Sequence, residues 1–219
     1  GESGSVYGAE MQARWKLAPE SVFTLGSSYI QEGTLQSPCL LFDLSEVDKI
    51  LALFAKHLPK VKLFYSVKAN NDTTILRHLQ ERGIGFDVAS VSELTAVLGL
   101  GVSPENVVLS NTIKNPECVR DIFRRRVPVT TVDNEYDLRA LAQESLFHNF
   151  RPQILVRIKV QPVGVQINLN EKFGCSAEEA VRLLGLSREL GLPPLGIHFH
   201  VGTQCKNVLS YANGVAMTI

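Results

Sequence analysis

Seven short runs of apolar, β-branched and aromatic residues recur along the chain from residue 38 onward. Each is followed by a polar turn and then by an amphipathic stretch. The runs are CLLFDL (39–44), LFYSVK (63–68), GFDVAS (85–90), NVVLSN (106–111), VTTVDN (129–134), ILVRIKV (154–160) and GIHFHVG (196–202). Strand-length runs that alternate with helical patterns favour a parallel sheet. The first five runs begin roughly 20 to 25 residues apart, the length of one strand and one helix in a (β/α) barrel.

The ends of the expected helices carry their own signals. Ser90 with Glu93, and Ser176 with Glu179, have the spacing of a capping box, in which two side chains satisfy free backbone N–H groups. Glycines that favour a left-handed C-terminal residue follow three of the amphipathic stretches: Gly83, Gly101 and Gly191. Agreement between the apolar pattern and these end signals strengthens the prediction of alternating strands and helices.

The pattern predicts the α/β class, as a (β/α)8 TIM-type barrel that is incomplete. A closed barrel needs eight strands, whereas about seven are found here. The last residues, NVLSYANGVAMTI, have the pattern of an opening helix, so we expect the barrel to be truncated before its eighth strand. The predicted organisation is an N-terminal segment at 1–36 and the barrel at 37–219. A doubly wound open sheet is the alternative, although the glycine-rich turn expected after its first strand is missing.

Composition narrows the classes of partner. The 219 residues include 22 Lys and Arg against 22 Asp and Glu, so the formal net charge is zero, and neither nucleic acid nor an anionic membrane is an expected partner. No apolar run reaches the ~18 residues of a membrane span, and the N-terminus lacks a signal-peptide pattern, so we expect a cytoplasmic protein. The four cysteines are widely spaced without a C-x-x-C pair, which predicts reduced thiols and no metal site.

Polar residues gather where the predicted strands end. In a (β/α) barrel the carboxyl ends of the strands carry the active site, so side chains at these positions share one rim. Each alone has an ordinary explanation as a solvent-facing or core side chain, and their joint placement indicates function. The rim residues are Lys68, Asp87, Asn111, Asp133, Arg157 and His200.

Lys68 suggests the chemistry of this rim. A lysine in a semi-enclosed site is a nucleophile towards aldehydes, so an imine with a carbonyl cofactor or a carbonyl substrate is expected. The two outcomes are a pyridoxal phosphate (PLP) enzyme and an aldolase-type enzyme. A histidine such as His200 can stack on a flat ring or move protons near neutral pH, and the combination favours PLP.

Four motifs, FYSVKAN, GFDVASVSEL, NEKFG and HFHVGTQ, resemble in order and spacing those of the ornithine/diaminopimelate/arginine decarboxylases of PLP fold type III, whose barrel is alanine-racemase-like. The resemblance runs from Ser37 to Tyr211. It implies pyridoxal 5'-phosphate as cofactor, a small amino-acid substrate and a homodimer with shared active sites. It also implies a C-terminal β-domain that is absent from this chain. The segment 1–36 is then either the family's N-terminal segment, which joins this second domain, or a partly ordered leader. We therefore expect the 219 residues to be a fragment that is inactive alone.

The resemblance assigns roles to individual residues. Lys68 is implied to form the imine with PLP and to be available for proton transfer, and His200 to stack on the pyridine ring. Asp87 and Glu93 are implied to belong to the polar network around the lysine and cofactor. Arg157 is implied to lie near the ring edge.

Thr203 stands where the family commonly has serine, and its hydroxyl is implied to bind the cofactor phosphate. Lys172 is implied to make a dimer contact. An exposed surface position for Lys172, and a purely helix-capping role for Glu93, are the alternatives.

The expected reaction is decarboxylation of a basic amino acid, ornithine or lysine. GFDVAS resembles the ornithine-type branch, whereas His198, His200 and Gln204 resemble the diaminopimelate branch, so diaminopimelate decarboxylase is an alternative. A second alternative is a catalytically inactive regulatory homologue of the antizyme-inhibitor type, against which the joint presence of Lys68, Asp87 and His200 argues. A third is a PLP racemase or a small PLP-carrier barrel.

Overall fold

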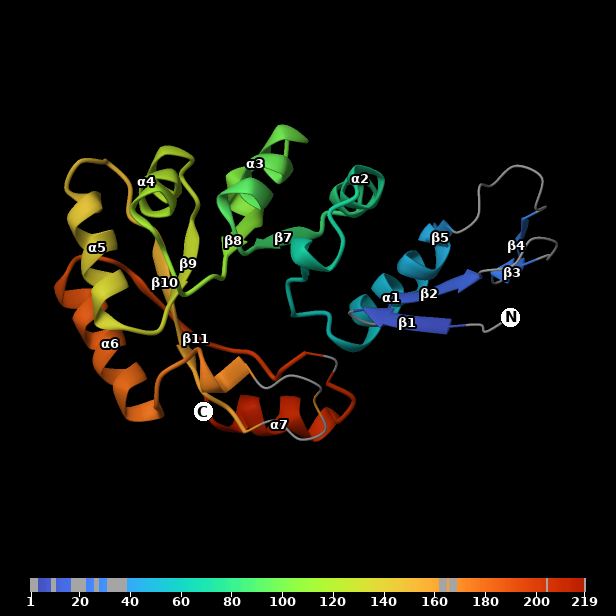
Figure 1. The fold of residues 1–219 in the computed structure, drawn as a ribbon. Helices are drawn as coiled ribbons and strands as arrows, with labels where there is room; N and C mark the ends of the chain where they lie inside the picture. Colours follow the sequence, from blue (N-terminus) through green and yellow to red (C-terminus); the bar gives the residue numbers. More distant parts are fainter. Residues whose placement is uncertain are drawn as a thin grey trace. The chain divides into compact units, whose positions relative to one another are not determined.

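The computed structural model describes residues 4–8, 11–16, 23–25, 28–30, 39–161, 165, 169–203 and 205–218, with side chains from residue 42 onward. The chain divides into two compact units, Gly1–Val61 and Lys62–Ile219, each of which is described by itself (Figure 1). The predicted boundary after residue 36 stays a prediction, because residues 31–38 lie outside the described ones. Most of the predicted segment 1–36 and Gln204 also lie outside them.

The first unit contains antiparallel strands and one long helix. β1 (Gly4–Gly8), β2 (Met11–Lys16) and β5 (Cys39–Leu41) form a three-stranded sheet, and β3 (Phe23–Leu25) pairs with β4 (Ser28–Ile30). Helix α1 (Leu44–His57) follows β5.

The run at 39–44 was predicted as the first barrel strand, and this prediction is wrong. Its residues Cys39–Leu41 pair antiparallel with β2 instead, in the register Lys16↔Cys39 to Arg14↔Leu41. An uninterrupted apolar run indicates a strand, but its pattern carries no information about which strand it pairs with.

The second unit is built on a six-stranded parallel sheet whose strands lie in the order β11-β10-β9-β8-β7-β6. Figure 1 shows β7 to β11 side by side. The strands are β6 (Phe64–Ser66), β7 (Gly85–Val88), β8 (Val107–Leu109), β9 (Val129–Val132), β10 (Gln153–Ile158) and β11 (Pro194–Phe199).

This strand order confirms the α/β class and an unclosed barrel, with six described strands in place of the expected seven. Every strand pairs with the next one along the sequence, and β6 and β11 form the two edges of the described sheet. A doubly wound sheet reverses its strand order at a switch point. No reversal occurs among the described strands, so the doubly wound alternative is excluded.

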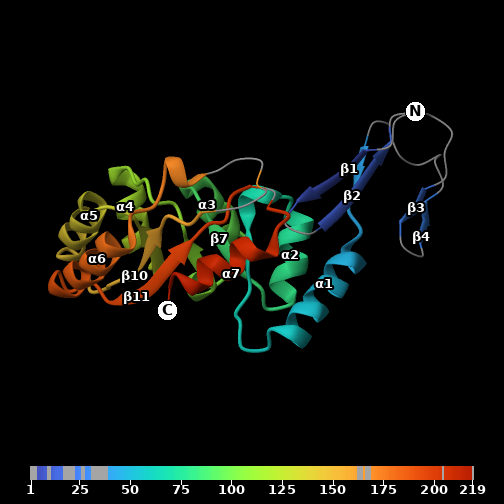
Figure 2. The same ribbon diagram turned by 90° about the horizontal axis from the view of Figure 1, so that it is seen from below.

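Helices follow the strands and bury one face of the sheet. Figure 1 and Figure 2 show α3 to α6 in succession along the outer side of the strands. The helices are α2 (Thr73–Glu81), α3 (Val91–Gly99), α4 (Pro116–Arg124), α5 (Glu135–Ser145), α6 (Ala177–Glu189) and α7 (Val208–Ala216), with short 3-10 turns η2 (Val67–Ala69), η3 (Pro104–Asn106) and η4 (Leu169–Glu171). No helix of the described residues is long and apolar enough to cross a membrane.

One face of the parallel sheet is fully buried against the helices. Its side chains include Phe86, Val107, Thr130 and Ile154, and this outer face forms the core. Side chains on successive strand positions point to opposite faces, so the intervening positions line the inner face, on which the polar rim residues lie. Burial on the inner face is uneven, because Asp87 is partly exposed whereas Arg157 is buried.

Predicted helix ends are found in the structure. The Ser90 hydroxyl accepts the Glu93 N–H at 3.2 Å, and the Glu93 carboxylate accepts the Ala89 N–H at 2.8 Å, which confirms a capping interaction at α3. The Ser176 hydroxyl likewise accepts the Glu179 N–H at 3.2 Å. The three glycines predicted at helix ends have positive φ: Gly83 (72°), Gly101 (84°) and Gly191 (75°).

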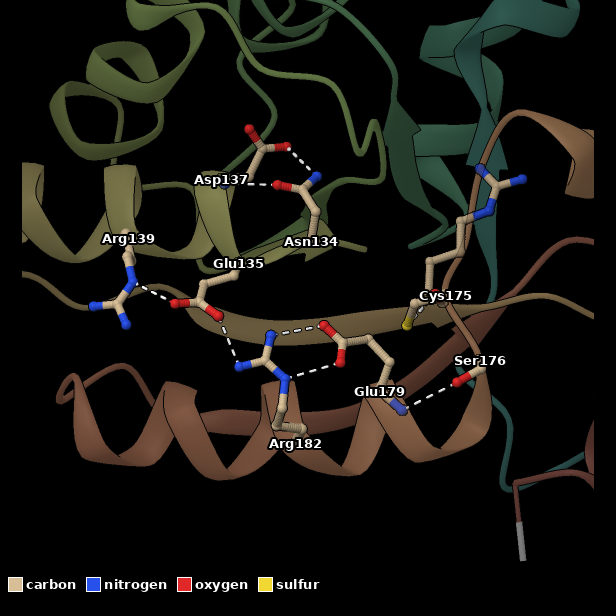
Figure 3. Close-up of polar contacts among 9 residues, drawn as sticks. Asn134, Glu135, Asp137, Arg139, Cys175, Ser176, Glu179 and Arg182 are labelled. Carbon is tan, nitrogen blue, oxygen red and sulfur yellow. Dashed lines mark hydrogen bonds and ion pairs between the residues drawn. The ribbon is translucent and has the colours of Figure 1, made fainter.

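A surface ion-pair network joins α5 to α6 (Figure 3). The Glu135 carboxylate pairs with Arg139 at 2.6 Å on its own helix and with Arg182 of α6 at 2.7 Å, and Arg182 also pairs with Glu179 at 2.7 Å. These side chains are substantially exposed, so water screens the pairs and their contribution to stability is small. The network lies on the outer helices and includes none of the rim residues.

Candidate active site

Lys68 lies in a braced turn at the end of β6. It belongs to η2 rather than to the strand itself, between the fully buried Val67 and an exposed alanine, and its own side chain is exposed. The Tyr65 hydroxyl donates to the Asn70 carbonyl at 3.1 Å, and the Asn70 side chain accepts the Asp72 N–H at 2.9 Å. The turn is therefore held at both ends, while the amine is left accessible to a carbonyl compound.

Asp87 lies beside the start of this turn. Its Oδ2 accepts a hydrogen bond from the Ser66 hydroxyl at 3.3 Å, since β6 and β7 pair in the register Ser66↔Asp87. Its Oδ1 is buried and has no donor among the described residues. A buried carboxylate oxygen without a donor is costly, so Oδ1 fits a donor on a bound group.

Arg157 on β10 provides the complementary donors. Its side chain is 7% exposed, and its guanidinium lies over the Phe173 ring, 5.1 Å from the centroid. Nε and Nη2 are buried without an acceptor among the described residues. Burial lowers the Arg157 pKa, and the nearby Asp133 carboxylate opposes this shift. The free donors fit an acceptor at the edge of a bound molecule.

His198 on β11 and His200, the residue after this strand, lie within electrostatic reach of Arg157 and Lys68. Burial, and then the positive charges of Arg157, His200 and Lys68, lower the pKa of His198 to about 4. Burial, and then Lys68 and Arg157, lower the pKa of His200 to about 4. Both rings are therefore neutral at pH 7. Of the two roles expected for His200, the neutral ring favours stacking over proton transfer.

A backbone donor selects the tautomer of His200. The Gly202 N–H donates to His200 Nδ1 at 2.9 Å, so this nitrogen presents its lone pair and the ring proton is assigned to Nε2. The Asn170 side chain donates to the His200 carbonyl at 3.4 Å and accepts the Val160 N–H at 3.2 Å. Asn170 therefore ties the ends of β10 and β11 together. Its place in a turn gave no signal in the sequence.

A second set of contacts fixes the end of β9 against β10. The Asp133 carboxylate accepts the Gly174 N–H at 2.8 Å, and the Cys175 N–H donates to the Arg157 carbonyl at 3.0 Å. The turn that carries Phe173 is thus held beside Arg157. The strand-end position of Asp133 indicated the rim, but not this contact.

Within the described part of the chain, the remaining predicted residues make no hydrogen bond to the other rim residues. Glu93 is half-buried and its Oε2 serves the cap of α3, Thr203 is half-buried just after Gly202, and Lys172 is exposed. The structure brings both Lys68 and Arg157 within electrostatic reach of the two histidines. The roles predicted for Glu93, Thr203 and Lys172 stay predictions.

The donor set suits an anionic aromatic aldehyde better than a metal. The accessible amine matches the aldehyde, and the neutral histidine ring matches the flat ring of such a molecule. The buried guanidinium donors and the buried carboxylate oxygen match its polar edge. Among the described residues no cluster of three His, Cys, Asp or Glu side chains is arranged to hold a metal ion.

We expect the neutral histidines to make the fold sensitive to acid. Their folded pKa values, about 4, lie below the ordinary 6.5, so the unfolded state binds more protons between these values. The free energy of unfolding should therefore fall as the pH drops from 6.5 towards 4, and His198→Gln should reduce this fall. Urea denaturation at several pH values measures it.

The exposed His57 provides the control. His57→Gln should leave the acid sensitivity of the wild-type protein unchanged. Equal loss of stability with falling pH in wild type and His198→Gln would contradict the prediction, because acid-titrating carboxylates alone would then explain the effect.

Comparison with known families shows that residues 44–219 match the pyridoxal-binding domain of the pyridoxal-dependent decarboxylases. Ornithine decarboxylase 2 of Drosophila melanogaster is 36% identical over 174 residues, which cover 79% of this chain and 43% of the relative. Antizyme inhibitor 2 of Xenopus laevis is 30% identical over 174 residues, covering 80% of this chain and 37% of the relative. The chain thus spans about two fifths of the length of these relatives.

Solved structures show the same fold. The lysine decarboxylase of Selenomonas ruminantium matches with a TM-score of 0.72 and 31% identity, over 80% of this chain and 45% of that one. A variant of SrLDC in complex with PLP matches with a TM-score of 0.80 and 29% identity, over 91% of this chain and 51% of that one. The open sheet described here therefore corresponds to part of a larger chain in these structures.

Proposed function

Because the chain belongs to the pyridoxal-dependent decarboxylase family through its pyridoxal-binding domain, we propose that it binds pyridoxal 5'-phosphate through Lys68 and serves the decarboxylation of a basic amino acid. The observation that carries the proposal is the position of Lys68. Its amine is exposed at the sheet rim within electrostatic reach of two neutral histidines. An accessible amine beside a neutral ring is what binding a flat aldehyde requires.

The protein's contribution is to hold the reacting groups in place. When bound, pyridoxal phosphate supplies the electron sink for the charge left by the departing carboxylate. Lys68 offers its amine, and the neutral ring of His200 offers a flat face and an Nε2–H donor. The free donors of Arg157 and the free Oδ1 of Asp87 accommodate polar atoms at the edge of the cofactor. These groups are positioned before binding, which reduces the ordering required.

Several finer assignments belong to the same proposal. The Thr203 hydroxyl binds the phosphate, Glu93 extends the polar network from the α3 cap, and Lys172 makes a contact between subunits of a homodimer with shared active sites. Partial coverage of the relatives supports a catalytic unit larger than these 219 residues, which by themselves are inactive. The cytoplasm is the proposed location.

The proposed substrate class is the basic amino acids, with ornithine or lysine first. Names of relatives support the class: the fly protein is an ornithine decarboxylase and the bacterial structure a lysine decarboxylase. They differ in the individual substrate. Diaminopimelate is the alternative that the His198 and His200 pair supports.

The similarity to an antizyme inhibitor supports a second candidate function, a regulatory homologue without turnover. The two functions make different demands on the rim. Turnover requires the amine of Lys68, the carboxylate of Asp87 and the ring of His200 together, whereas binding a regulatory partner requires none of them.

The test is release of carbon dioxide from carboxyl-labelled ornithine, lysine, diaminopimelate and arginine. It compares the 219-residue chain with the longest product of its gene, each with and without pyridoxal phosphate. We expect cofactor-dependent release from ornithine or lysine by the longer product and little release by the 219 residues. Cofactor binding without release from any of the four amino acids would instead support the regulatory homologue.

A further inference from the structure

Lys114 is a buried lysine that the proposed function does not use. It lies in the segment between β8 and α4, and it is 7% exposed. Its ammonium donates to the carbonyl oxygen of Asn111 at 2.6 Å and to that of Thr131. Lysine is almost never fully buried without a partner, so this placement requires a reason.

Its two carbonyl partners belong to different strand ends. Asn111 follows β8, and Thr131 lies in β9, seventeen residues further along the chain than Lys114. Both carbonyls lie next to the rim. One ammonium therefore bridges two neighbouring strand ends at the same edge as the candidate site.

Two carboxylates lie near the same ammonium. Asp137, at the start of α5, exerts the larger electrostatic effect on Lys114, and Asp133 exerts a smaller one. Asp137 is anchored to the cap of α5 through Asn134, as Figure 3 shows. The Asn134 amide also donates to Asp133, at 2.9 Å. Asp133 in addition accepts the Gly174 N–H and acts electrostatically on Arg157. Both carboxylates are thus tied to Asn134, and Asp133 also connects to the candidate site.

We propose that Lys114 is a positioning residue for the Arg157 edge of the cofactor site. Its ammonium fixes the end of β9, so that the Asp133 carboxylate holds the Gly174 turn in place. This turn carries Phe173, on which the Arg157 guanidinium stacks. The inference rests on the proposed function only in taking Arg157 as part of the cofactor site.

Lys114 does not serve as a second reactive amine. Burial lowers its pKa to about 8, and Asp137, Cys118 and Asp133 oppose the shift. A lysine of this pKa would be a good nucleophile if it were accessible, but its donors are directed at backbone carbonyls within the fold. Pyridoxal phosphate should therefore react at Lys68 and leave Lys114 unmodified.

The test is Lys114→Met, which keeps an unbranched apolar side chain as far as the ε position and removes the charge and the donors. Hydrogen exchange of the Gly174 amide should become about ten-fold faster relative to the sheet amides, the factor that corresponds to weakening one hydrogen bond to a charged group. Affinity for pyridoxal phosphate, measured by absorbance titration of the same protein, should fall by a similar factor.

Two further variants separate positioning from general stability. Leu183→Ala removes a fully buried core side chain of α6, and it should speed exchange broadly without singling out Gly174. Lys114→Met with Asp137→Asn also removes the carboxylate that has the larger electrostatic effect on Lys114. It should recover part of the lost stability and still show fast exchange at Gly174, because the Thr131 carbonyl still lacks its ammonium donor.

Two results would overturn the proposal. One is exchange at Gly174 in Lys114→Met that rises only as much as in Leu183→Ala. The other is a phosphopyridoxyl group found on Lys114 after borohydride reduction of the wild-type protein. The Gly174 measurement needs no cofactor. A wild-type protein that fails to bind pyridoxal phosphate would therefore count against the proposed function and leave the Gly174 result to decide the role of Lys114.

Discussion

Lys68→Ala should abolish the fixation of pyridoxal phosphate by borohydride. In the wild-type protein the exposed Lys68 amine, held at the end of a braced turn, should form the bond that borohydride reduces. Alanine removes the amine that reacts with the aldehyde, and we expect no neighbouring group to take its place. Lys68→Arg should fail equally, because guanidinium stays protonated and is a poor nucleophile. Peptide mass spectrometry after reduction locates and quantifies the modified lysine.

Lys62 provides the matched control. It is also exposed and lies two residues before β6, where its amine contacts Asn106 at 3.3 Å. Lys62→Ala should leave the labelling of Lys68 at the wild-type level. Equal label in wild type and Lys68→Ala, spread over surface lysines, would show that the assignment of Lys68 is wrong.

Gly174→Ala should destabilise the second unit by about 2 to 5 kcal/mol. Gly174 has φ of 91°, which costs other residues about 1 to 2 kcal/mol. A Cβ atom there would lie 2.9 Å from the Ile158 carbonyl carbon and 3.0 Å from the Lys159 nitrogen. Both atoms belong to backbone, which cannot rotate away, so overpacking adds about 1 to 3 kcal/mol. Urea denaturation measures the loss.

Gly185→Ala is the control for this substitution. Gly185 lies within α6, and nothing approaches within 4 Å of the position of an added Cβ. Alanine there should stabilise the helix by about 0.5 to 1 kcal/mol. If Gly174→Ala unfolded at the wild-type urea concentration, the close approach of the Gly174 turn to β10 would not constrain the fold. Binding of pyridoxal phosphate should weaken with Gly174→Ala and remain unchanged with Gly185→Ala.

The parts of the fold that sequence predicts are those encoded locally. Each strand of the parallel sheet is an apolar run between turn residues, and each cap, such as Ser90 with Glu93, involves residues a few positions apart. The partner of Cys39–Leu41 could not be predicted, because an apolar run fits an antiparallel sheet as well as a parallel one.

The candidate site divides in the same way. Lys68, Asp87, Arg157 and His200 could be proposed because they lie at or just after the carboxyl ends of strands, and the fold class brings strand ends together. The contacts that support them join distant residues. Asp133 meets Gly174 across 41 positions, and Asn170 meets His200 across 30. Such pairs depend on the paths of the connecting turns, which carry little local signal.

The sequential strand order has a consequence for how the protein folds during synthesis. Each new strand of the parallel sheet finds its partner in the strand made just before it, so each pairing closes a loop of one strand and one helix, or little more. Because the ribosome synthesises the chain from its N-terminus, each strand after β6 emerges when its partner strand has already been made. Assembly can then run in one direction, with Lys68 at the first edge and His200 at the last.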